Sequence, residues 1–309
     1  MPASVVVPVY NSEATLEELV KRLGAVLGGL GTPYEVILVN DGSRDRSWER
    51  IRGLAQERPW VRGINLMRNF GQHNALLCGI RAARHDLIVT LDDDLQNPPE
   101  EIPKLLARLE QGCDVVYGTP QKRQHGWWRN LASGVTRLAL QNAMGAATAR
   151  QVGPFRAFRS RLREAFADYR NPYVSIDVLL TWGSTRFAGI PVRHDPRPTG
   201  ASQYTFRKLL TLALNMMTGF STLPLQLASL LGFSLTLFGV VVLVYVLARY
   251  LMAGGSVPGF PFLASIIAIF SGAQLFALGI IGEYLSRIHF RMMERPSYAI
   301  DSTTDREET

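Results

Sequence analysis

The chain contains only two cysteines, Cys78 and Cys113, among its 309 residues. They are far apart in the sequence and lack the close spacing of cysteines that bind a metal as a pair. Isolated thiols fit a reducing compartment such as the cytosol, where disulfides are rare. We therefore expect both cysteines to be ordinary core residues.

The sequence also has no glycine-rich loop for phosphate. Neither G-x-G-x-x-G nor G-x-x-x-x-G-K-[ST] occurs, which argues against a dinucleotide enzyme or a P-loop NTPase. The formal net charge is +7, but the sequence has neither a basic run nor a known nucleic-acid module. We expect no nucleic-acid partner, because an anionic bilayer would account for basic residues beside apolar segments.

Charge becomes scarce after about residue 225, where two long apolar stretches begin, roughly 225–253 and 262–288. Each exceeds the ~20 residues that cross a bilayer as a helix. Two buried core helices are the alternative, but apolar stretches of this length rarely occur in soluble domains. The connector between them, residues 254–261, carries no charge and is too short to be a domain. The stretches therefore predict a transmembrane hairpin with both flanks on one side.

Basic residues flank this predicted hairpin. Arg207 and Lys208 precede the first span, and Arg287, Arg291 and Arg295 follow the second. Positive residues favour the cytoplasmic side of a membrane. We therefore expect a multi-pass protein of the cytoplasmic (inner) membrane, with its large N-terminal part and both termini in the cytoplasm.

Strand and helix patterns alternate along the first 200 or so residues. Apolar runs at 4–10, 35–40, 61–66 and 87–91 are typical of strands, and helical spacing separates them. This alternation predicts a doubly wound, mostly parallel α/β sheet. Such sheets bind ligands at the carboxyl ends of their strands. Tyr10, Asp41 and Asp92–Asp94 all fall at predicted strand ends.

Three consecutive aspartates, Asp92–Asp94, and Gln96 follow the last of these strands. Adjacent carboxylates raise one another's pKa unless a cation lies among them. Hard oxygen ligands favour Mg²⁺ or Mn²⁺ over zinc, and such an ion commonly holds substrate phosphates. The cluster predicts a metal site for a nucleotide donor. The alternative is a solvated acidic turn that caps a helix starting near residues 97–101.

Several motifs together resemble glycosyltransferase family 2, which has the GT-A fold: PVYN at 8–11, NDGS at 40–43 and DDDLQ at 92–96. Further stretches are similar to the polyprenyl-phosphate glycosyltransferases: RNFGQH at 68–73, NPPEEIP at 97–103 and GIIGEY at 279–284. The bacterial undecaprenyl-phosphate enzymes, such as the aminoarabinose transferase of lipid A modification, look most similar. The resemblance spans nearly the whole chain. It implies a GT-A-type sheet followed by a two-helix transmembrane hairpin.

The resemblance also implies how a nucleotide-sugar donor would bind. Pro8 and Tyr10 would lie against the base, and Asp41 would accept a hydrogen bond from the N3–H of uracil. Glu13 would help to hold the same nucleoside. For Tyr10, a core aromatic at a strand end is the structural alternative.

The metal, Mg²⁺ or Mn²⁺, would have Asp94 and Gln96 as direct ligands. Asp92 would contact either the ribose or the metal through water. Asp93 joins the nucleotide site, although relatives usually have a small residue at this position.

The acceptor implied by the resemblance is a polyprenyl phosphate, which requires cations near the membrane. Arg123 and Arg129 flank an aromatic segment able to cover the site. Arg197 begins a stretch that includes Ser202 and Tyr204 and resembles a second phosphate-binding region. Arginine can hold phosphate oxygens in a bidentate manner, so Arg197 is the expected clamp. A plain surface role is the alternative for each arginine.

The predicted reaction is an inverting transfer of the sugar from the nucleotide-sugar, a UDP-sugar by resemblance, to the lipid phosphate. Asp94 with its metal, together with Arg123, Arg129 and Arg197, forms the expected catalytic set, which stabilises charge on the leaving diphosphate.

A general base is not evident in the sequence. Some relatives carry an aspartate before a Phe-Arg pair, where this chain has Pro154. A phosphate monoester has a second pKa near ~6 and is already largely dianionic at neutral pH, so a base is dispensable. Asp177 is an alternative acid nearby in the sequence.

Other functions are less well supported by the sequence. A processive polysaccharide synthase should show Gln-x-x-Arg-Trp after the aspartates, and this run does not occur. A catalytically inactive membrane scaffold would not need intact metal and nucleotide motifs, and a transporter would need more spans. We expect a catalytic domain at 1–203, an interfacial amphipathic helix region at 204–224, two transmembrane helices within 225–288 and a cytoplasmic tail at 289–309. The resemblance further implies a homo-oligomer, a tetramer.

Overall fold

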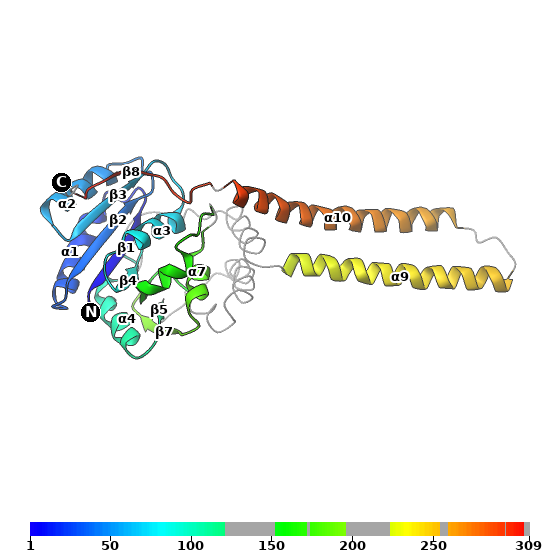
Figure 1. Ribbon diagram of the computed structural model, residues 1–309, viewed down its shortest axis with the longest axis horizontal. Coiled ribbons are helices and arrows are strands. Elements are labelled where there is room, and N and C mark those ends of the chain that lie inside the picture. Colours follow the sequence, from blue (N-terminus) through cyan, green and yellow to red (C-terminus); the bar gives the residue numbers. More distant parts are fainter. Residues whose placement is uncertain (121–151, 172–173, 196–222, 254–258, 294, 306–309) are drawn as a thin grey trace.

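A computed structural model of the chain describes residues 1–120, 152–171, 174–195, 223–253, 259–293 and 295–305. These residues form an α/β domain and two long helices that extend away from it side by side (Figure 1). The N-terminus and β8 (Ile300–Thr303), which follows the two long helices, both lie in the α/β domain.

The α/β domain is built on a mixed sheet with the strand order β7-β5-β6-β4-β1-β2-β3-β8. The strands are β1 (Ala3–Val9), β2 (Tyr34–Asn40), β3 (Val61–Leu66), β4 (Leu87–Thr90), β5 (Val115–Pro120), β6 (Arg156–Arg159), β7 (Phe187–Val192) and β8 (Ile300–Thr303). Strand β1 is parallel to β2 and β4, and β2 is parallel to β3. Strand β6 runs antiparallel to β4 and β5, and β8 runs antiparallel to β3. The predicted mostly parallel, doubly wound sheet is confirmed.

Helices cover both faces of this sheet. The helices of the domain are α1 (Leu16–Gly28), α2 (Ser47–Glu57), α3 (Gln72–Ala82), α4 (Ile102–Glu110) and α7 (Ile176–Gly183), with short 3₁₀ segments η1 (Pro99–Glu101) and η2 (Ser160–Phe166). Residues of α1, α2 and α4 form a core with one face, and residues of α3, η2 and α7 form a core with the other. The domain is therefore a three-layer structure.

The central strands show why their sequences are apolar without interruption. In β1, Val5, Val7 and Val9 belong to one core, whereas Val6 belongs to the other. Side chains alternate between the faces of a strand, so a strand covered on both faces needs apolar residues throughout. This covering also fixes the register, because a slip by one residue would exchange the two cores.

The hairpin consists of α9 (Leu223–Ala253) and α10 (Phe260–Met292). Two windows within it, Leu225–Arg249 of 25 residues and Ile269–Ser286 of 18 residues, are long and apolar enough to cross a membrane. Apart from Ala228, the described side chains of these two stretches are not buried inside the protein. Core helices of a soluble domain would be covered by other elements, so this exposed apolar surface is that of a membrane protein.

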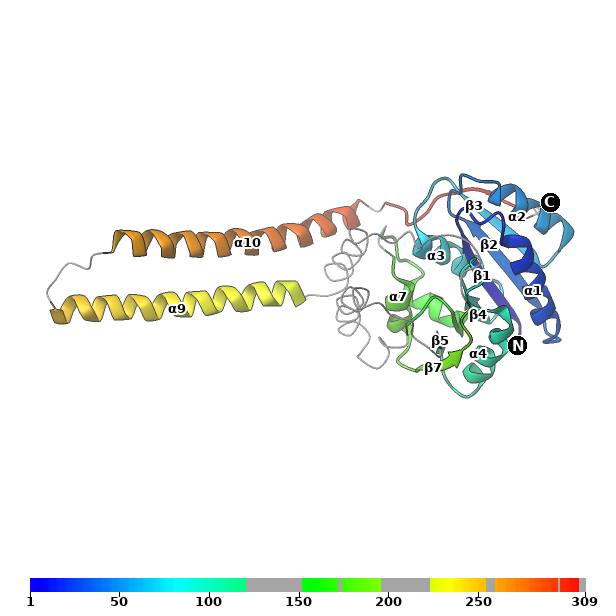
Figure 2. The same ribbon diagram turned by 180° about the vertical axis from the view of Figure 1, so that it is seen from behind.

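A short strand follows the hairpin and returns to the α/β domain. Strand β8, labelled in Figure 1, pairs with β3, the last of the parallel strands on that side of the sheet. Figure 2 shows the red segment that leads from α10 back to the domain from behind. The sequence predicted only a tail for this part of the chain. Its four residues are mostly exposed and show no apolar alternation, which is the signal that normally identifies a strand.

Candidate active site

Three loops meet at the carboxyl ends of β1, β2 and β4. The backbone N–H of Tyr10 donates to Asp93 Oδ2 at 3.2 Å, which joins the loop after β1 to the loop after β4. The N–H of Asn11 donates to Ser43 Oγ at 3.0 Å, which joins it to the loop after β2. The structure thus brings together the polar residues that follow these strands, as expected for ligand binding in an open α/β sheet.

Tyr10 lies at the open side of this edge. Its side chain is 38% exposed, whereas the preceding Val9 is fully buried. The alternative reading of Tyr10 as a core aromatic is therefore wrong. Pro8 lies within β1 and pairs with Val39 of β2, directly beneath the loop.

Glu13 links the loop after β1 to the start of α2. Its backbone N–H donates to Asp45 Oδ2 at 3.1 Å, and its carboxylate accepts from the N–H of Arg46 at 3.4 Å. These contacts hold the loops after β1 and β2 together on the side away from Asp93.

Asp41 is buried, with 3% exposure, and both of its carboxylate oxygens accept backbone hydrogen bonds. The donors are the N–H groups of Phe70 at 2.7 Å and Gly71 at 2.9 Å, just before α3. Burial raises the pKa of Asp41, and the two N–H groups oppose the rise. Asp41 therefore fixes the loop that precedes α3.

Gly42 also joins the turn after β2 to the loop before α3, in this case through close packing. Its φ is +65°, and a Cβ atom there would clash with the backbone of Arg68 and Asn69. Glycine is the residue that adopts this conformation without cost and allows such close approach. The turn after β2 and the loop before α3 therefore pack as one unit.

The three aspartates after β4 have three different partners. Asp92 Oδ1 accepts from Gln72 Nε2 at 2.6 Å, Asp93 accepts from Tyr10, and Asp94 Oδ1 accepts from the N–H of Gln96 at 3.1 Å. Desolvation raises the pKa of Asp93, and Asp94 adds to the rise. In this structure the three carboxylates are therefore held by three different parts of the protein.

Within the described residues, no group of three or more His, Cys, Asp or Glu side chains is arranged to hold a metal. Protein-bound Mg²⁺ commonly has only one or two carboxylate ligands and takes the rest from substrate phosphates and water. Asp92 and Asp94, with the amide of Gln96, form a hard oxygen donor set of this kind. The residues present fit a divalent ion that is completed by a diphosphate.

The loop itself has a strained turn. Leu95 has a φ of +60°, in the left-handed region that a bulky residue rarely adopts. Its side chain is buried, with 8% exposure, which offsets the cost of this conformation. The turn places Gln96 N–H against Asp94, and such strain is often found at functional sites.

A buried ion pair that the sequence analysis missed lies beneath the aspartate loop. Arg156, 1% exposed, pairs with Asp177, and its Nε donates to Thr90 Oγ1 at 2.9 Å. Tyr117 OH donates to Asp177 Oδ1 at 3.1 Å. Burial disfavours the charged guanidinium, but Asp177 outweighs burial and holds the pKa of Arg156 above its usual value. Thr90 ends β4, so this cluster supports the strand that leads into the site.

This cluster also bears on the question of a general base. The Asp177 carboxylate is committed to Arg156 and Tyr117, which makes it a structural acid. Pro154 lies beside the same strand, with its carbonyl accepting from Thr90 Oγ1 at 2.9 Å. The Phe-Arg pair that follows Pro154 in the sequence is the signal that could have identified Arg156.

The predicted acceptor residues lie outside the described part of the chain. These are Arg123, Arg129, Arg197, Ser202 and Tyr204.

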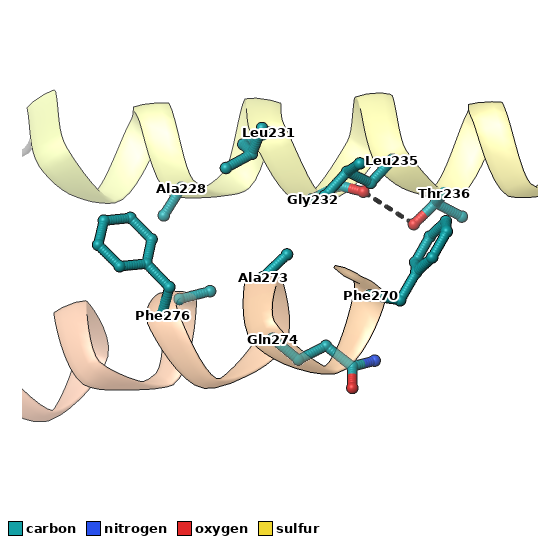
Figure 3. A pocket seen from close by; sticks show the side chains of 10 residues that line it. Ala228, Leu231, Gly232, Leu235, Thr236, Phe270, Ala273, Gln274 and Phe276 are labelled. Carbon is teal, nitrogen blue, oxygen red and sulfur yellow. Dashed lines mark hydrogen bonds between the residues drawn. The ribbon is translucent and has the colours of Figure 1, made fainter. Parts of the chain in front are cut away.

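A cavity of about 160 Å³ lies between α9 and α10, away from the strand ends. Its lining is mostly apolar and includes Leu231, Phe270 and Phe276, while Thr236 Oγ1 donates to the backbone carbonyl of Gly232 at 2.8 Å (Figure 3). A polar hydroxyl satisfied within its own helix is typical of a helix in an apolar surrounding.

The fold and site define a class: a GT-A-type α/β domain with an aspartate loop at its strand ends, attached to a membrane hairpin. Residues 4–169 match Glycosyl transferase family 2. This match covers more than half of the chain, and the chain belongs to glycosyltransferase family 2.

The similarity to curated relatives extends over nearly the whole chain. The chain is 39% identical over 301 residues to undecaprenyl-phosphate 4-deoxy-4-formamido-L-arabinose transferase of Pseudomonas aeruginosa (strain LESB58), covering 96% of this chain and 89% of the relative. It is 38% identical over 303 residues to the protein of the same name from Edwardsiella ictaluri (strain 93-146), covering 97% and 93%.

A solved structure supports the fold. Glucosyl-3-phosphoglycerate synthase from Mycobacterium tuberculosis, in complex with Mn²⁺, UDP and glucosyl-3-phosphoglycerate, has a TM-score of 0.51 and 20% sequence identity. The similarity covers 70% of this chain and 77% of that one. At this identity the similarity shows the GT-A fold alone.

Proposed function

We propose that this protein transfers a sugar, with inversion, from a UDP-sugar to a polyprenyl phosphate, which yields a polyprenyl-monophosphate sugar for the cell envelope. The observation that carries the proposal is the similarity, over 96% of the chain, to an undecaprenyl-phosphate sugar transferase. The convergence of the aspartate loop with Tyr10 and Asp41 at one sheet edge supports it. Undecaprenyl phosphate is the proposed acceptor, and a sugar of lipid A modification is the leading donor class.

The donor side of the site uses the loops after β1 and β2. The exposed ring of Tyr10, next to Pro8, is available to stack on a nucleobase, an arrangement in which aromatic rings contribute binding energy. Asp41 would accept a hydrogen bond from the uracil N–H in addition to those from Phe70 and Gly71, and Glu13 would help to hold the same nucleoside. Asp93 orients the backbone of Tyr10 through its hydrogen bond.

A divalent ion, Mg²⁺ or Mn²⁺, completes the proposed site. Asp94 and Gln96 would hold it directly, and Asp92 would contact it through water or bind the ribose. When bound, the ion stabilises negative charge on the leaving diphosphate. The protein groups keep its ligands in place through the Asp94–Gln96 turn and the hydrogen bond from Gln72 to Asp92.

The acceptor side is assigned to the arginines. Arg197 with Arg123 and Arg129 would bind the phosphates, and Ser202 and Tyr204 would add hydrogen bonds. With proline at position 154, no carboxylate of that stretch serves as base. The acceptor phosphate, largely dianionic at neutral pH because its second pKa is near ~6, attacks the anomeric carbon without one.

The pairing of β8 supports a topology for the protein. The two long helices come after the catalytic part of the chain and are followed by a strand that pairs with β3 of the same sheet. This pairing supports the proposal that both ends of the hairpin lie on one side of the membrane. The basic flanks assign that side to the cytoplasm, and the resemblance supports a homotetramer.

A transfer assay tests this proposal. Detergent-purified protein would receive undecaprenyl phosphate, Mg²⁺ and, one at a time, UDP- and GDP-sugars. We expect glycolipid from one UDP-sugar, loss of product with EDTA, and a large loss of turnover in Arg197→Ala with unchanged membrane association. UDP binding without glycolipid from any donor would contradict the proposed acceptor. An Arg197→Ala variant that turns over normally would contradict the clamp.

A further inference from the structure

The segment that follows the hairpin, residues 297–305, binds the catalytic domain through more contacts than its short strand requires. We call it the C-terminal strap. At its far end, Arg62 donates from Nε and Nη2 to the Asp305 carboxylate at 2.7 and 2.8 Å. Gly63 exchanges two hydrogen bonds with Thr304, at 2.7 and 2.9 Å. At its near end, Ser297 Oγ donates to the carbonyl of Asn171 at 2.9 Å.

A chain of side-chain hydrogen bonds runs from the strap to the nucleotide loops. Asn65 Nδ2 donates to Asp301 Oδ2 at 3.0 Å, and Asn40 Nδ2 donates to Asn65 Oδ1 at 2.7 Å. The N–H of Ser43 donates to Asn40 Oδ1 at 3.4 Å, and Ser43 Oγ accepts from the N–H of Asn11 at 3.0 Å. This series of hydrogen bonds ends at Asn11, beside Tyr10.

Asp301 sets the direction of this chain. An ionised carboxylate only accepts hydrogen bonds, whereas an asparagine amide has one accepting and one donating end. Asp301 therefore turns the donating end of Asn65 toward the strap and its accepting end toward Asn40. Asn40, at the end of β2, is then oriented so that its own carbonyl faces the turn at Ser43.

A second contact reaches the other side of the same turn. The N–H of Met67 donates to the carbonyl of Ala299 at 3.0 Å, where the strap begins to follow β3. Met67 leads directly into residues 68–71, whose backbone holds the Asp41 carboxylate and packs on Gly42. The strap thus contacts both segments that enclose Asp41.

We propose that the C-terminal strap is a positioning element of the nucleotide site, and that Asp301 is the residue that positions the turn at Asn40–Ser43 through Asn65. This inference rests on the proposed function, because it concerns the same donor site. It gives the segment after the membrane hairpin a part in donor binding. The simpler alternative is that the strap only covers the edge of β3, as proteins commonly do with an exposed strand.

A measurement of UDP affinity distinguishes a positioning role of the strap from simple covering of the edge of β3. Full-length wild-type protein and three single variants, Asp301→Ala, Asp301→Asn and Thr303→Ala, would be titrated with UDP and Mn²⁺ in detergent. Asp301→Ala should bind UDP about five-fold more weakly and raise the donor KM similarly, with kcat nearly unchanged, the size expected for one hydrogen bond. Asp301→Asn keeps an accepting oxygen but also has a donating end, so it should restore the affinity in part. Thr303→Ala is the matched control, because this exposed side chain lies on the same strand.

Wild-type affinity in Asp301→Ala would overturn the inference. Equal losses of UDP affinity in Asp301→Ala and Thr303→Ala would also overturn it. So would losses of affinity that parallel a fall in melting temperature in both variants, because either result would show that the strap only covers the edge of the sheet. Wild-type protein that binds no UDP would overturn the proposed function and this inference with it. A selective loss in Asp301→Ala that Asp301→Asn reverses in part would support the strap as a positioning element.

Discussion

The three aspartates after β4 are adjacent in the sequence and differ in what they do. Asp93 points back to the loop after β1, and Asp92 is held by Gln72 of α3. Asp94 stabilises a turn with the N–H of Gln96 and is the carboxylate that we propose as a direct ligand of the metal. Different hydrogen-bond partners hold the three carboxylates, although Asp94 still raises the pKa of Asp93.

Asp94→Asn tests the metal assignment. We expect turnover with Mg²⁺ or Mn²⁺ to fall about 100-fold or more, because a bound ion contributes several kcal/mol to charge stabilisation. The melting temperature should stay near that of the wild type, since the substitution keeps the size of the side chain. Asp93→Asn is the matched control, and it should raise the donor KM more than it lowers kcat. Full activity in Asp94→Asn would remove this residue from the metal site.

Asp177→Asn tests the buried cluster under β4. The substitution leaves the guanidinium of Arg156 buried without its counter-charge, and we expect the free energy of unfolding to fall by about 3–5 kcal/mol. The double variant Arg156→Met with Asp177→Leu should recover much of this loss, because it removes the uncompensated charge. Thermal unfolding of the three proteins in detergent measures the effect. A single variant as stable as the double variant would contradict the account.

The site residues differ in whether a local sequence pattern is sufficient to predict their position. Tyr10, Asp41 and the aspartate run each follow an apolar strand in the sequence, so their convergence at a sheet edge could be predicted. The Arg156–Asp177 pair joins a strand to a helix about 20 residues later, and no local pattern indicates the pairing. The structural role of Asp41 was also not evident, because its partners are backbone N–H groups.

Among the elements, β8 depends most on a few charged contacts. Arg62 lies between Glu35 at 2.7 Å and Asp305 at 2.7 Å. Burial opposes ionisation of Glu35, but hydrogen bonds from Ser4 and Arg62 outweigh it and hold the pKa of Glu35 below its usual value. The hydrogen bond from Arg62 likewise lowers the pKa of Asp305. Glu35, Arg62 and Asp305, which we call the charged clasp, therefore join the segment of β8 to the edge of the sheet.

The stabilisation by this clasp should depend on pH. A carboxyl group whose pKa is lowered by folding stabilises the protein above its unfolded pKa, and this contribution is lost as the pH falls through the folded pKa. We expect Asp305→Asn to lower the free energy of unfolding by about 0.5–1 kcal/mol at pH 7, as for a partly exposed ion pair. The difference from the wild type should shrink below about pH 4. Thermal unfolding across pH measures it, and a difference that is constant with pH would contradict the clasp.

The elements also show where sequence patterns are sufficient. Strands buried on both faces and the amphipathic α1, with Leu16, Leu19 and Leu23 on one side, follow directly from periodicity. The two apolar helices follow from length and composition. Strand β8 could not be predicted, because its partners in β3, Ile64, Asn65 and Leu66, are more than 200 residues away in the sequence.

At the scale of the whole molecule, strands that come before and after the two long helices belong to one sheet. Strand β3 precedes the hairpin and β8 follows it, yet they are neighbours in one sheet. This pairing supports the proposal that an even number of membrane crossings separates them. The two apolar stretches and their short connector predicted the same arrangement from the sequence, and the strand pairing supports it by an independent argument.

Cysteine labelling tests this arrangement. In a Cys113→Ser background, Ser256→Cys in the connector should react with an impermeant maleimide on intact spheroplasts, whereas Thr303→Cys should react only after lysis. Burial raises the pKa of the remaining Cys78 to about 12, which keeps this thiol unreactive. Reaction of both positions from the outside, or of Ser256→Cys only after lysis, would contradict the proposed orientation.

The central claim is that the sugar passes to a lipid monophosphate with loss of the whole nucleoside diphosphate. The most direct test identifies both products of one reaction, with the released nucleotide separated by chromatography and the glycolipid weighed by mass spectrometry. We predict UDP and a lipid that carries one phosphate and one sugar, in equal amounts, and neither product in the presence of EDTA. Release of UMP with a lipid that carries two phosphates would contradict the account.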